Sequence, residues 1–156
     1  MIKLLRVDSR LLHGQIAVSW TNYVGTDCIL VAGDHIDPVV VTIMKMSKPA
    51  GVKLVIKNVA DSITAINSGK TDPYQLFILV ESVTDAYRLA KACPQIKKIN
   101  IGRTKRLEGT QPLNDETWVS ESEKAMLREL DAAGYDMVLQ MIPSSKAVPV
   151  RRALKD

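Results

Sequence analysis

Short apolar runs recur along the chain and are separated by longer amphipathic segments. The runs favour β-strands because they span about four to eight residues and are bounded by turn residues. A continuous run such as DCILVAG, residues 27–33, is typical of a strand buried on both faces of a sheet. Strands are predicted at residues 2–7, 27–33, 52–58, 74–81, 96–102 and 136–142.

The segments between these strands carry apolar residues on one helical face. In residues 14–24, for example, Ile16, Ala17 and Trp20 share a face. Helices are predicted at residues 14–24, 37–48, 61–68, 82–92 and 120–133. The expected N-terminal caps are Asp37, Asp61, Ser82 or Thr84, and Ser120 with Glu123 in a capping box.

Strands joined by helices of this length pair in parallel through right-handed crossovers. The sequence therefore predicts one α/β domain over residues 1–156: an open, mainly parallel twisted sheet of about six to seven strands with helices on both faces. Residues 103–119 are expected to form a β-hairpin or an ordered loop, and only a short tail is expected after Pro143. The apolar helix faces are all needed to cover the sheet, so no dimer surface is expected and self-association stays open.

Charge and aromatic content add little to this picture. Lys and Arg number 21 against 17 Asp and Glu, which gives a net charge of +4 and mildly favours acidic partners or phosphate. The basic residues are dispersed, and one Phe, two Trp and four Tyr offer few rings for base stacking. A nucleic-acid binder is therefore a weaker alternative, and no nucleic acid is predicted as a partner.

The sequence lacks the marks of export, of membrane insertion and of metal or nucleotide binding. No apolar run approaches the ~20 residues of a membrane span, and the start MIKLLRVD does not fit a secretory signal, so a cytoplasmic location is expected. Cys28 and Cys93 are expected to be free buried thiols. His13 and His35 lack metal-ligand spacing, and His35 is expected in a surface loop. No Walker or GxGxxG motif is present, so neither a metal nor a cofactor is predicted.

Candidate chemistry gathers where the first strand meets the first helix. Ligand sites in open α/β sheets form beyond the carboxyl ends of the strands, which is where His13 lies. The free N–H groups of a helix N-terminus favour a bound phosphate, and the guanidinium of Arg10 suits two phosphate oxygens. A neutral imidazole can attack phosphorus without a general base, so these residues suit a phosphohistidine. A structural histidine, and an Arg6–Asp8 pair on one strand face, remain simpler interpretations.

The stretch RVDSRLLHGQ, residues 6–15, resembles the active loop of a known family. That family is the IIB subunits of the mannose/fructose/sorbose family of the bacterial sugar phosphotransferase system. Its usual form is R-[IV]-D-x-R-[LI]-[LIV]-H-G-Q, and this chain matches it at every position. The likeness continues at Trp20, at PAGV in residues 49–52, at INIG in residues 99–102 and at IPS in residues 142–144.

The resemblance implies that the protein is a phosphotransferase and a phosphocarrier. A family member takes a phosphoryl group from a phosphohistidine on the partner IIA domain, holds it on Nδ1 of the loop histidine, here His13, and passes it to a sugar bound by the membrane IIC/IID complex. The protein is then cytoplasmic and associates with the inner face of the membrane through IIC/IID. An α/β module that binds a phosphorylated ligand without covalent transfer is the alternative.

The resemblance also assigns roles to residues around His13. It implies that Arg10 steadies the phosphoryl group and that Asp8 orients the loop or the imidazole. It further implies that the backbone N–H groups of Gly14 and Gln15 bind phosphate oxygens and that Ser144 lies on a loop that faces the phosphate.

Two positions depart from the family pattern. Arg103 stands where a second glycine often follows Gly102, and Ser145 stands where an aspartate is frequent. Both departures leave the sugar and the cognate IIA and IIC/IID partners unassigned.

Overall fold

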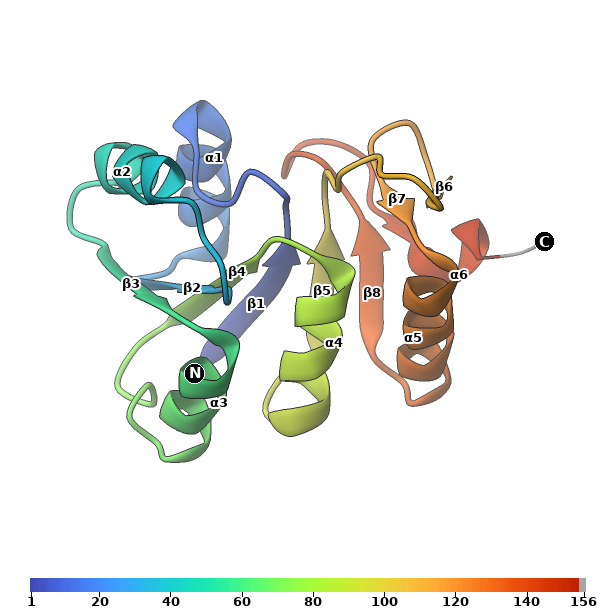
Figure 1. Cartoon of the computed structure of the whole chain (residues 1–156). Helices are drawn as coiled ribbons and strands as arrows, with labels where there is room; N and C mark the ends of the chain where they lie inside the picture. The colour runs from blue at the N-terminus through green and yellow to red at the C-terminus, as the bar shows by residue number, and fades with distance from the viewer. Residues whose placement is uncertain (155–156) are drawn as a thin grey trace.

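Seven strands form one open sheet in the computed structural model, which describes residues 1–154 (Figure 1). The strands are β1 (Ile2–Val7), β2 (Cys28–Ala32), β3 (Lys53–Lys57), β4 (Leu76–Val80), β5 (Lys98–Ile101), β8 (Asp136–Leu139) and β9 (Val148–Pro149). Their order is β3-β2-β4-β1-β5-β8-β9, and every neighbouring pair is parallel except the last. The predicted fold class is confirmed. Residues 155 and 156 of the predicted domain lie outside the described residues.

Helices cover both faces of the sheet. They are α1 (Gly14–Val24), α2 (Pro38–Ser47), α3 (Val59–Asn67), α4 (Val83–Ala92), α5 (Glu121–Ala132) and α6 (Val150–Ala153). Trp20 of α1 and Met44 of α2 pack with Ile29 and Phe77 on one face. The helices α3, α4 and α5 pack on the opposite face around Leu30 and neighbouring strand residues. None of the helices within residues 1–154 is long and apolar enough to cross a membrane.

Most of the predicted helix caps are confirmed. The side chains of Asp37, Ser82 and Ser120 each accept a hydrogen bond from a first-turn N–H group, and Ser120 forms the full capping box. The predicted Asp61 cap is wrong, because Asn58 accepts a hydrogen bond of 2.7 Å from the Asp61 N–H group. Helix α3 therefore begins two residues earlier, and Asp61 lies in its first turn, where a negative charge is favourable.

The C-terminal third contains more structure than the sequence predicts. The hairpin expected within residues 103–119 is present as β6 (Gln111–Pro112) and β7 (Trp118–Val119), which pair antiparallel. The short tail expected after Pro143 is wrong, because β9 pairs antiparallel with β8 and α6 packs beside α5. Strand β9 has two residues, which are too few to show an alternating pattern. As an edge strand, it also tolerates Pro149.

Both cysteines are buried free thiols, as predicted. Cys28 lies in β2 and Cys93 follows α4. Burial raises the pKa of both thiols. They stay protonated at neutral pH, so neither is a competing nucleophile.

Candidate functional site

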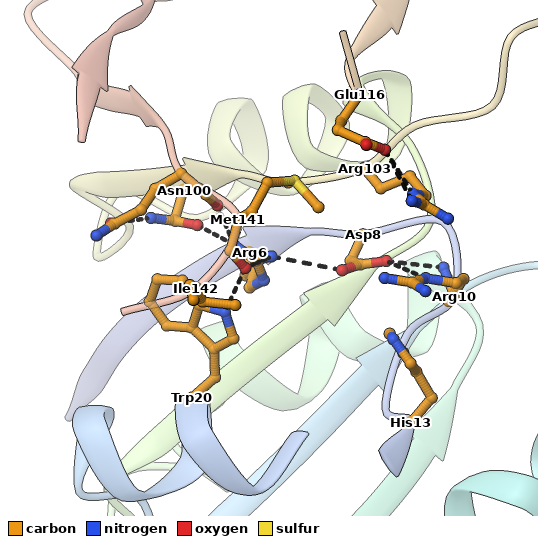
Figure 2. A network of polar contacts seen from close by, with 12 residues as sticks. Arg6, Asp8, Arg10, His13, Trp20, Asn100, Arg103, Glu116, Met141 and Ile142 are labelled. Carbon is orange, nitrogen blue, oxygen red and sulfur yellow. Dashed lines mark hydrogen bonds and ion pairs between the residues drawn. The ribbon is translucent and has the colours of Figure 1, made fainter. Parts of the chain in front are cut away.

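The candidate site begins where β1 ends, in a loop of residues 8–13 that leads into α1 (Figure 2). Neighbouring segments hold the loop: the Asp8 N–H group donates to the Val80 carbonyl at 2.9 Å, and the Ser9 N–H group donates to the Arg103 carbonyl at 2.8 Å. Leu11 has a φ of 58°, a left-handed conformation that costs energy for a leucine. Its side chain is buried between α1 and the sheet, which holds the backbone in this turn.

His13 occupies the N-cap position of α1 and is half-buried. Its Nδ1 atom lies 3.2 Å from the Leu11 carbonyl oxygen, which is a suitable acceptor for an Nδ1–H group. Its Nε2 atom is buried and has no hydrogen-bond partner among residues 1–154. The imidazole is therefore held by one ring nitrogen, at the helix end where the sequence places the anion site.

The two backbone amides predicted to bind phosphate lie beside this ring, and both residues are exposed. The Gly14 N–H group donates to the Ser47 hydroxyl of α2 at 3.3 Å. The Gln15 N–H group belongs to the first helical turn, where amides have no acceptor within the helix. Sequence reasoning missed Ser47, which lies 33 positions away and carries no local motif.

Asp8 connects the strand to the loop. It is buried, and its Oδ1 atom accepts a hydrogen bond of 3.0 Å from the Arg10 N–H group and lies 3.8 Å from Arg10 Nε. Within residues 1–154, none of its hydrogen bonds reaches the imidazole of His13. Of the two roles expected for Asp8, the geometry fits the orientation of the loop. The side chain of Arg10 is partly exposed and lies on the same side of the loop as His13 (Figure 2).

Arg6 lies at the centre of a network of polar contacts beneath the loop. The sequence predicted only one of these contacts, the pair with Asp8. It is 1% exposed, and its guanidinium stacks 4.3 Å from the centre of the Trp20 ring. Its acceptors are Asn100 Oδ1, the Gln140 carbonyl at 2.8 Å, the Met141 carbonyl at 2.9 Å and Asp8 Oδ2 at 3.4 Å. Burial lowers the pKa of Arg6 to about 10, so the guanidinium stays charged at neutral pH. Arg6 therefore ties the ends of β1, β5 and β8 together beneath the loop.

Gly102 lies against this guanidinium, which gives a direct test of the network. A Cβ atom at this position would lie 2.8 Å from Arg6 Cζ and closer still to Nη2. Because Arg6 is fixed by four acceptors, we expect Gly102→Ala to lower the unfolding free energy by about 1–3 kcal/mol. Urea denaturation measures the change. Gly134→Ala is not a suitable control because its φ is 89°, but Ala147→Gly changes one methyl group at an exposed site and is expected to cost no more than about 1 kcal/mol, the effect of glycine on the entropy of the unfolded chain.

Ser144 lies in the turn between β8 and β9, which the network brings to the same edge of the sheet. The Met141 carbonyl in this turn accepts hydrogen bonds from Trp20 Nε1 at 3.0 Å and from Arg6. Ser144 itself is exposed. The hydroxyl of Ser145 donates to the Ile142 carbonyl at 2.8 Å and so closes the turn.

Arg103, the other departure from the family pattern, also lies at this edge. Its guanidinium pairs with the Glu116 carboxylate at 2.8 Å, and its carbonyl accepts the hydrogen bond from Ser9. Both departures therefore help to shape the loops around the site.

A cavity of about 360 Å³ lies beyond the ends of β2 and β4, beside the β6–β7 hairpin. His35 lines it and is exposed, which confirms the predicted surface loop position. The carboxylates of Asp34, Glu81 and Asp85 make the lining acidic. Within residues 1–154, no three His, Cys, Asp or Glu side chains are arranged to hold a metal ion. The cavity therefore offers no anion site comparable with the His13 loop.

The cavity gives a prediction about pH, because burial raises the pKa of the Glu81 carboxyl. The folded state then keeps its proton to higher pH than the unfolded state does, so the unfolding free energy falls as pH rises from the ordinary pKa to the raised one. At pH values above the raised pKa, Glu81→Gln removes the free-energy cost of keeping an ionised carboxylate in this partly buried site. We expect a gain of about 0.5 kcal/mol at pH 7, small because the group is partly hydrated, and no gain at pH 3.

Urea denaturation at the two pH values measures this change. Glu108→Gln, at an exposed carboxylate, is the matched control and is expected to change little at either pH. A Glu81→Gln protein that is less stable than the wild type at pH 7 would contradict the prediction.

The arrangement around His13 can bind and accept a phosphoryl group. Imidazole supplies a lone pair, Arg10 supplies a partly exposed positive group, and the start of α1 supplies an amide and the positive end of the helix dipole. These are the elements that phosphoryl transfer needs, since positioning and charge stabilisation account for most of its catalysis.

Comparisons with known proteins agree with this chemistry. The chain matches, over residues 2–156, the family described as PTS system sorbose subfamily IIB component. It is 34% identical to a probable phosphotransferase enzyme IIB component of Streptococcus pyogenes, over 95% of this chain and 96% of that protein. It is 28% identical to the PTS system mannose-specific EIIAB component of Escherichia coli, where 91% of this chain matches 45% of that protein. The crystal structure of the IIBSor domain of the sorbose permease from Klebsiella pneumoniae has the same fold, with a TM-score of 0.92 and 23% identity over 99% of this chain and 96% of that one.

Proposed function

Because the chain belongs to the sorbose subfamily of IIB components of the sugar phosphotransferase system, and is thus a IIB phosphocarrier, we propose that His13 carries the phosphoryl group. The observation that supports this assignment is the position of the half-buried imidazole at the start of α1, beside Arg10 and the Gln15 amide. Family membership also decides against the alternative of a module that binds a phosphorylated ligand without covalent transfer.

The proposed step is an in-line transfer between two imidazoles. The lone pair of His13 Nδ1 forms a new N–P bond while the N–P bond of the donor phosphohistidine breaks, and the donor ring keeps the electron pair. The contact between Nδ1 and the Leu11 carbonyl is incompatible with this attack. The ring must first rotate away from this carbonyl, lose the Nδ1 proton to water and take up a proton on Nε2, which leaves the Nδ1 lone pair free to attack. The unpartnered Nε2 atom has no hydrogen bond to lose in that rotation.

The neighbouring residues have separate roles in the proposal. Arg10 neutralises the phosphoryl oxygens, and Asp8 fixes the backbone of Arg10 through its hydrogen bond of 3.0 Å. The amides of Gly14 and Gln15 donate to the oxygens, and the Gly14 amide must first leave Ser47. Ser144 faces the phosphoryl group from the β8–β9 turn, which Arg6 and Trp20 hold at the site through Met141.

We further propose that residues 1–156 work as one IIB domain between two partners, without a cofactor. The donor is a phosphorylated IIA protein, and the E. coli relative supports this because its name is EIIAB and this chain matches 45% of its length. The acceptor is a sugar held by a IIC/IID membrane complex, so the protein works in the cytoplasm at the inner face of the membrane. The names of the relatives include mannose, sorbose and N-acetylgalactosamine, so they do not select one sugar for this chain.

A labelling experiment tests the proposal. The protein is incubated with phosphoenolpyruvate, the general phosphotransferase proteins and a IIA protein of the mannose/sorbose family. We expect one phosphate per chain, labile in acid and stable in alkali, as is characteristic of a phosphohistidine. Absence of such a phosphate would refute the assignment of His13.

A further inference from the structure

The hydroxyl of Ser47 lies beside the proposed phosphoryl site, although no motif predicts it. Ser47 is the last residue of α2 and is partly buried. Its Oγ atom accepts a hydrogen bond of 3.3 Å from the Gly14 N–H group, which is the first amide of α1. The end of α2 thus meets the start of α1 next to His13, the N-cap residue.

The hydroxyl hydrogen of Ser47 is not used within the described chain. A serine hydroxyl donates one hydrogen bond and accepts two. Thr42, on the same helix, donates its hydroxyl hydrogen to the Pro38 carbonyl at 3.2 Å, which is a common arrangement in helices. Ser47 makes no such bond: among residues 1–154, its hydroxyl accepts from Gly14 and donates to no oxygen. A donor is therefore free next to the amide that the phosphoryl group needs.

The backbone at the end of α2 offers only acceptors. The last carbonyl groups of a helix have no partner within it, and they form the negative end of the helix dipole, which repels an anion. Lys48, the next residue, donates to the Val52 carbonyl at 2.9 Å and lines the groove beside β3. The Ser47 hydroxyl is therefore the group through which this helix end can donate a hydrogen bond towards the His13 loop.

The Gly14 amide can bind either this hydroxyl or a phosphoryl oxygen. Because an N–H···O bond is about 2.9 Å long, an oxygen of phosphorylated His13 that binds the amide displaces Ser47 Oγ, which lies 3.3 Å from the same nitrogen. Rotation about one side-chain bond moves the hydroxyl aside and leaves it within hydrogen-bond distance of the incoming oxygen. The hydroxyl then donates to a negatively charged acceptor, and such a bond is stronger than one between neutral groups.

We propose that Ser47 is a phosphoryl-binding residue. Its hydroxyl accepts from the Gly14 amide while His13 is free, and donates to a phosphoryl oxygen while His13 is phosphorylated. The inference rests on the proposed function of His13 as the phosphoryl carrier. The exchange replaces one hydrogen bond in the free protein with two in the loaded protein, so Ser47 favours the loaded state. No covalent bond to Ser47 forms or breaks.

The end of α2 can be altered without disturbing the core. Met44 is the fully buried residue of this helix. Three of its apolar residues are exposed: Val39, Ile43 and Met46. The expectation that all apolar helix faces are used to cover the sheet is therefore wrong for α2. Because alanine favours a helix more than serine does, Ser47→Ala is expected to fold.

The test compares Ser47→Ala with Ser47→Thr, which keeps a hydroxyl, and with Thr42→Val, which removes an exposed hydroxyl from the same helix. Each protein is mixed with phosphorylated IIA, and the ratio of loaded to free protein is measured at equilibrium. We expect the equilibrium constant for loading to fall about tenfold in Ser47→Ala, because a hydrogen bond to a charged oxygen is lost. In Ser47→Thr and Thr42→Val it is expected to stay within about twofold of the wild-type value.

Initial rates separate phosphoryl binding from docking of the donor protein. In Ser47→Ala, the kcat for uptake from phosphorylated IIA is expected to fall at least about threefold while KM stays within about twofold, since Ser47 contacts the transferred group. Phosphoramidate transfers its phosphoryl group to histidine and releases ammonia, so it loads His13 without a protein donor. Uptake from phosphoramidate is expected to slow by a similar factor.

An equilibrium constant for Ser47→Ala within about twofold of the wild-type value overturns the proposed role of Ser47. A defect that Ser47→Thr does not reverse, or one that appears only with the protein donor, overturns it too. Each of these outcomes leaves the assignment of His13 intact, because acid-labile phosphate still forms. A wild-type protein that gains no such phosphate from either donor refutes the assignment of His13, and the role of Ser47 with it.

Discussion

A His13→Ala protein is expected to take up no acid-labile phosphate from phosphorylated IIA, a loss of at least about 10⁴-fold in rate, because the ring is the nucleophile. The Asp8 carboxylate in the loop is buried and hydrogen-bonded, a phosphate ester on the Ser9 hydroxyl would be stable in acid, and the two thiols outside the loop are buried and protonated. The imidazole is half-buried and makes one hydrogen bond, so the variant is expected to fold. Radiolabelled phosphoenolpyruvate measures the uptake, and thermal unfolding confirms the fold.

The second histidine provides a matched control for this result. The chain contains two histidines, and His35 is exposed beside the acidic cavity on the other side of the β4 end. His35→Ala is expected to take up phosphate at the wild-type rate. The reverse outcome, in which His13→Ala is labelled and His35→Ala is not, would move the carrier role to His35.

The elements of the fold that follow from local patterns were predictable. Asp37 was predicted as a cap because Pro38 follows it in the first turn, and Ser120 because Glu123 completes a capping box; both cap in the structure. The wrong cap predicted for α3 also has a local origin, because Asn58 and Asp61 are both residue types that cap helices. Strand β3 ends at Lys57, and Asn58, the next residue, caps the helix. Strand β9 is stabilised by its pairing with β8. This is a tertiary contact, and a strand of two residues is too short for its sequence pattern to predict it.

The candidate site divides in the same way between local and distant residues. The motif of residues 6–15 predicted the site residues of the loop, because these residues are contiguous and can be matched one by one to a family motif. For Arg6 the sequence predicted only the pair with Asp8. Its other partners are distant in sequence, Asn100 by 94 positions and Met141 by 135. Apolar periodicity likewise identified α2 as a helix and left unsettled which of its faces packs against the sheet.

Arg6→Met is expected to lower the unfolding free energy by about 3–5 kcal/mol, the largest stability effect predicted for this chain. The change removes a buried charge that stays ionised at neutral pH, since its pKa is about 10. The Asp8 carboxylate then stays buried with no cation within 3.5 Å of Oδ2, and the Gln140 and Met141 carbonyls lose their guanidinium donor. Methionine fills part of the space against Trp20 but donates no hydrogen bond. Urea denaturation at pH 7 measures the loss.

The exposed ion pairs of Arg88 provide the control that separates burial from charge. Arg88 pairs with Asp34 at 2.8 Å and with Asp85 at 3.4 Å on the surface, so Arg88→Met is expected to cost about 0–1 kcal/mol. Equal losses in the two variants would show that Arg6 acts as an ordinary ion-pair partner. Arg6→Lys restores the charge without the planar fork that reaches several acceptors at once, so it is expected to recover only part of the stability. A full recovery would mean that charge alone, and not the joining of three strand ends, explains why an arginine lies beneath the His13 loop.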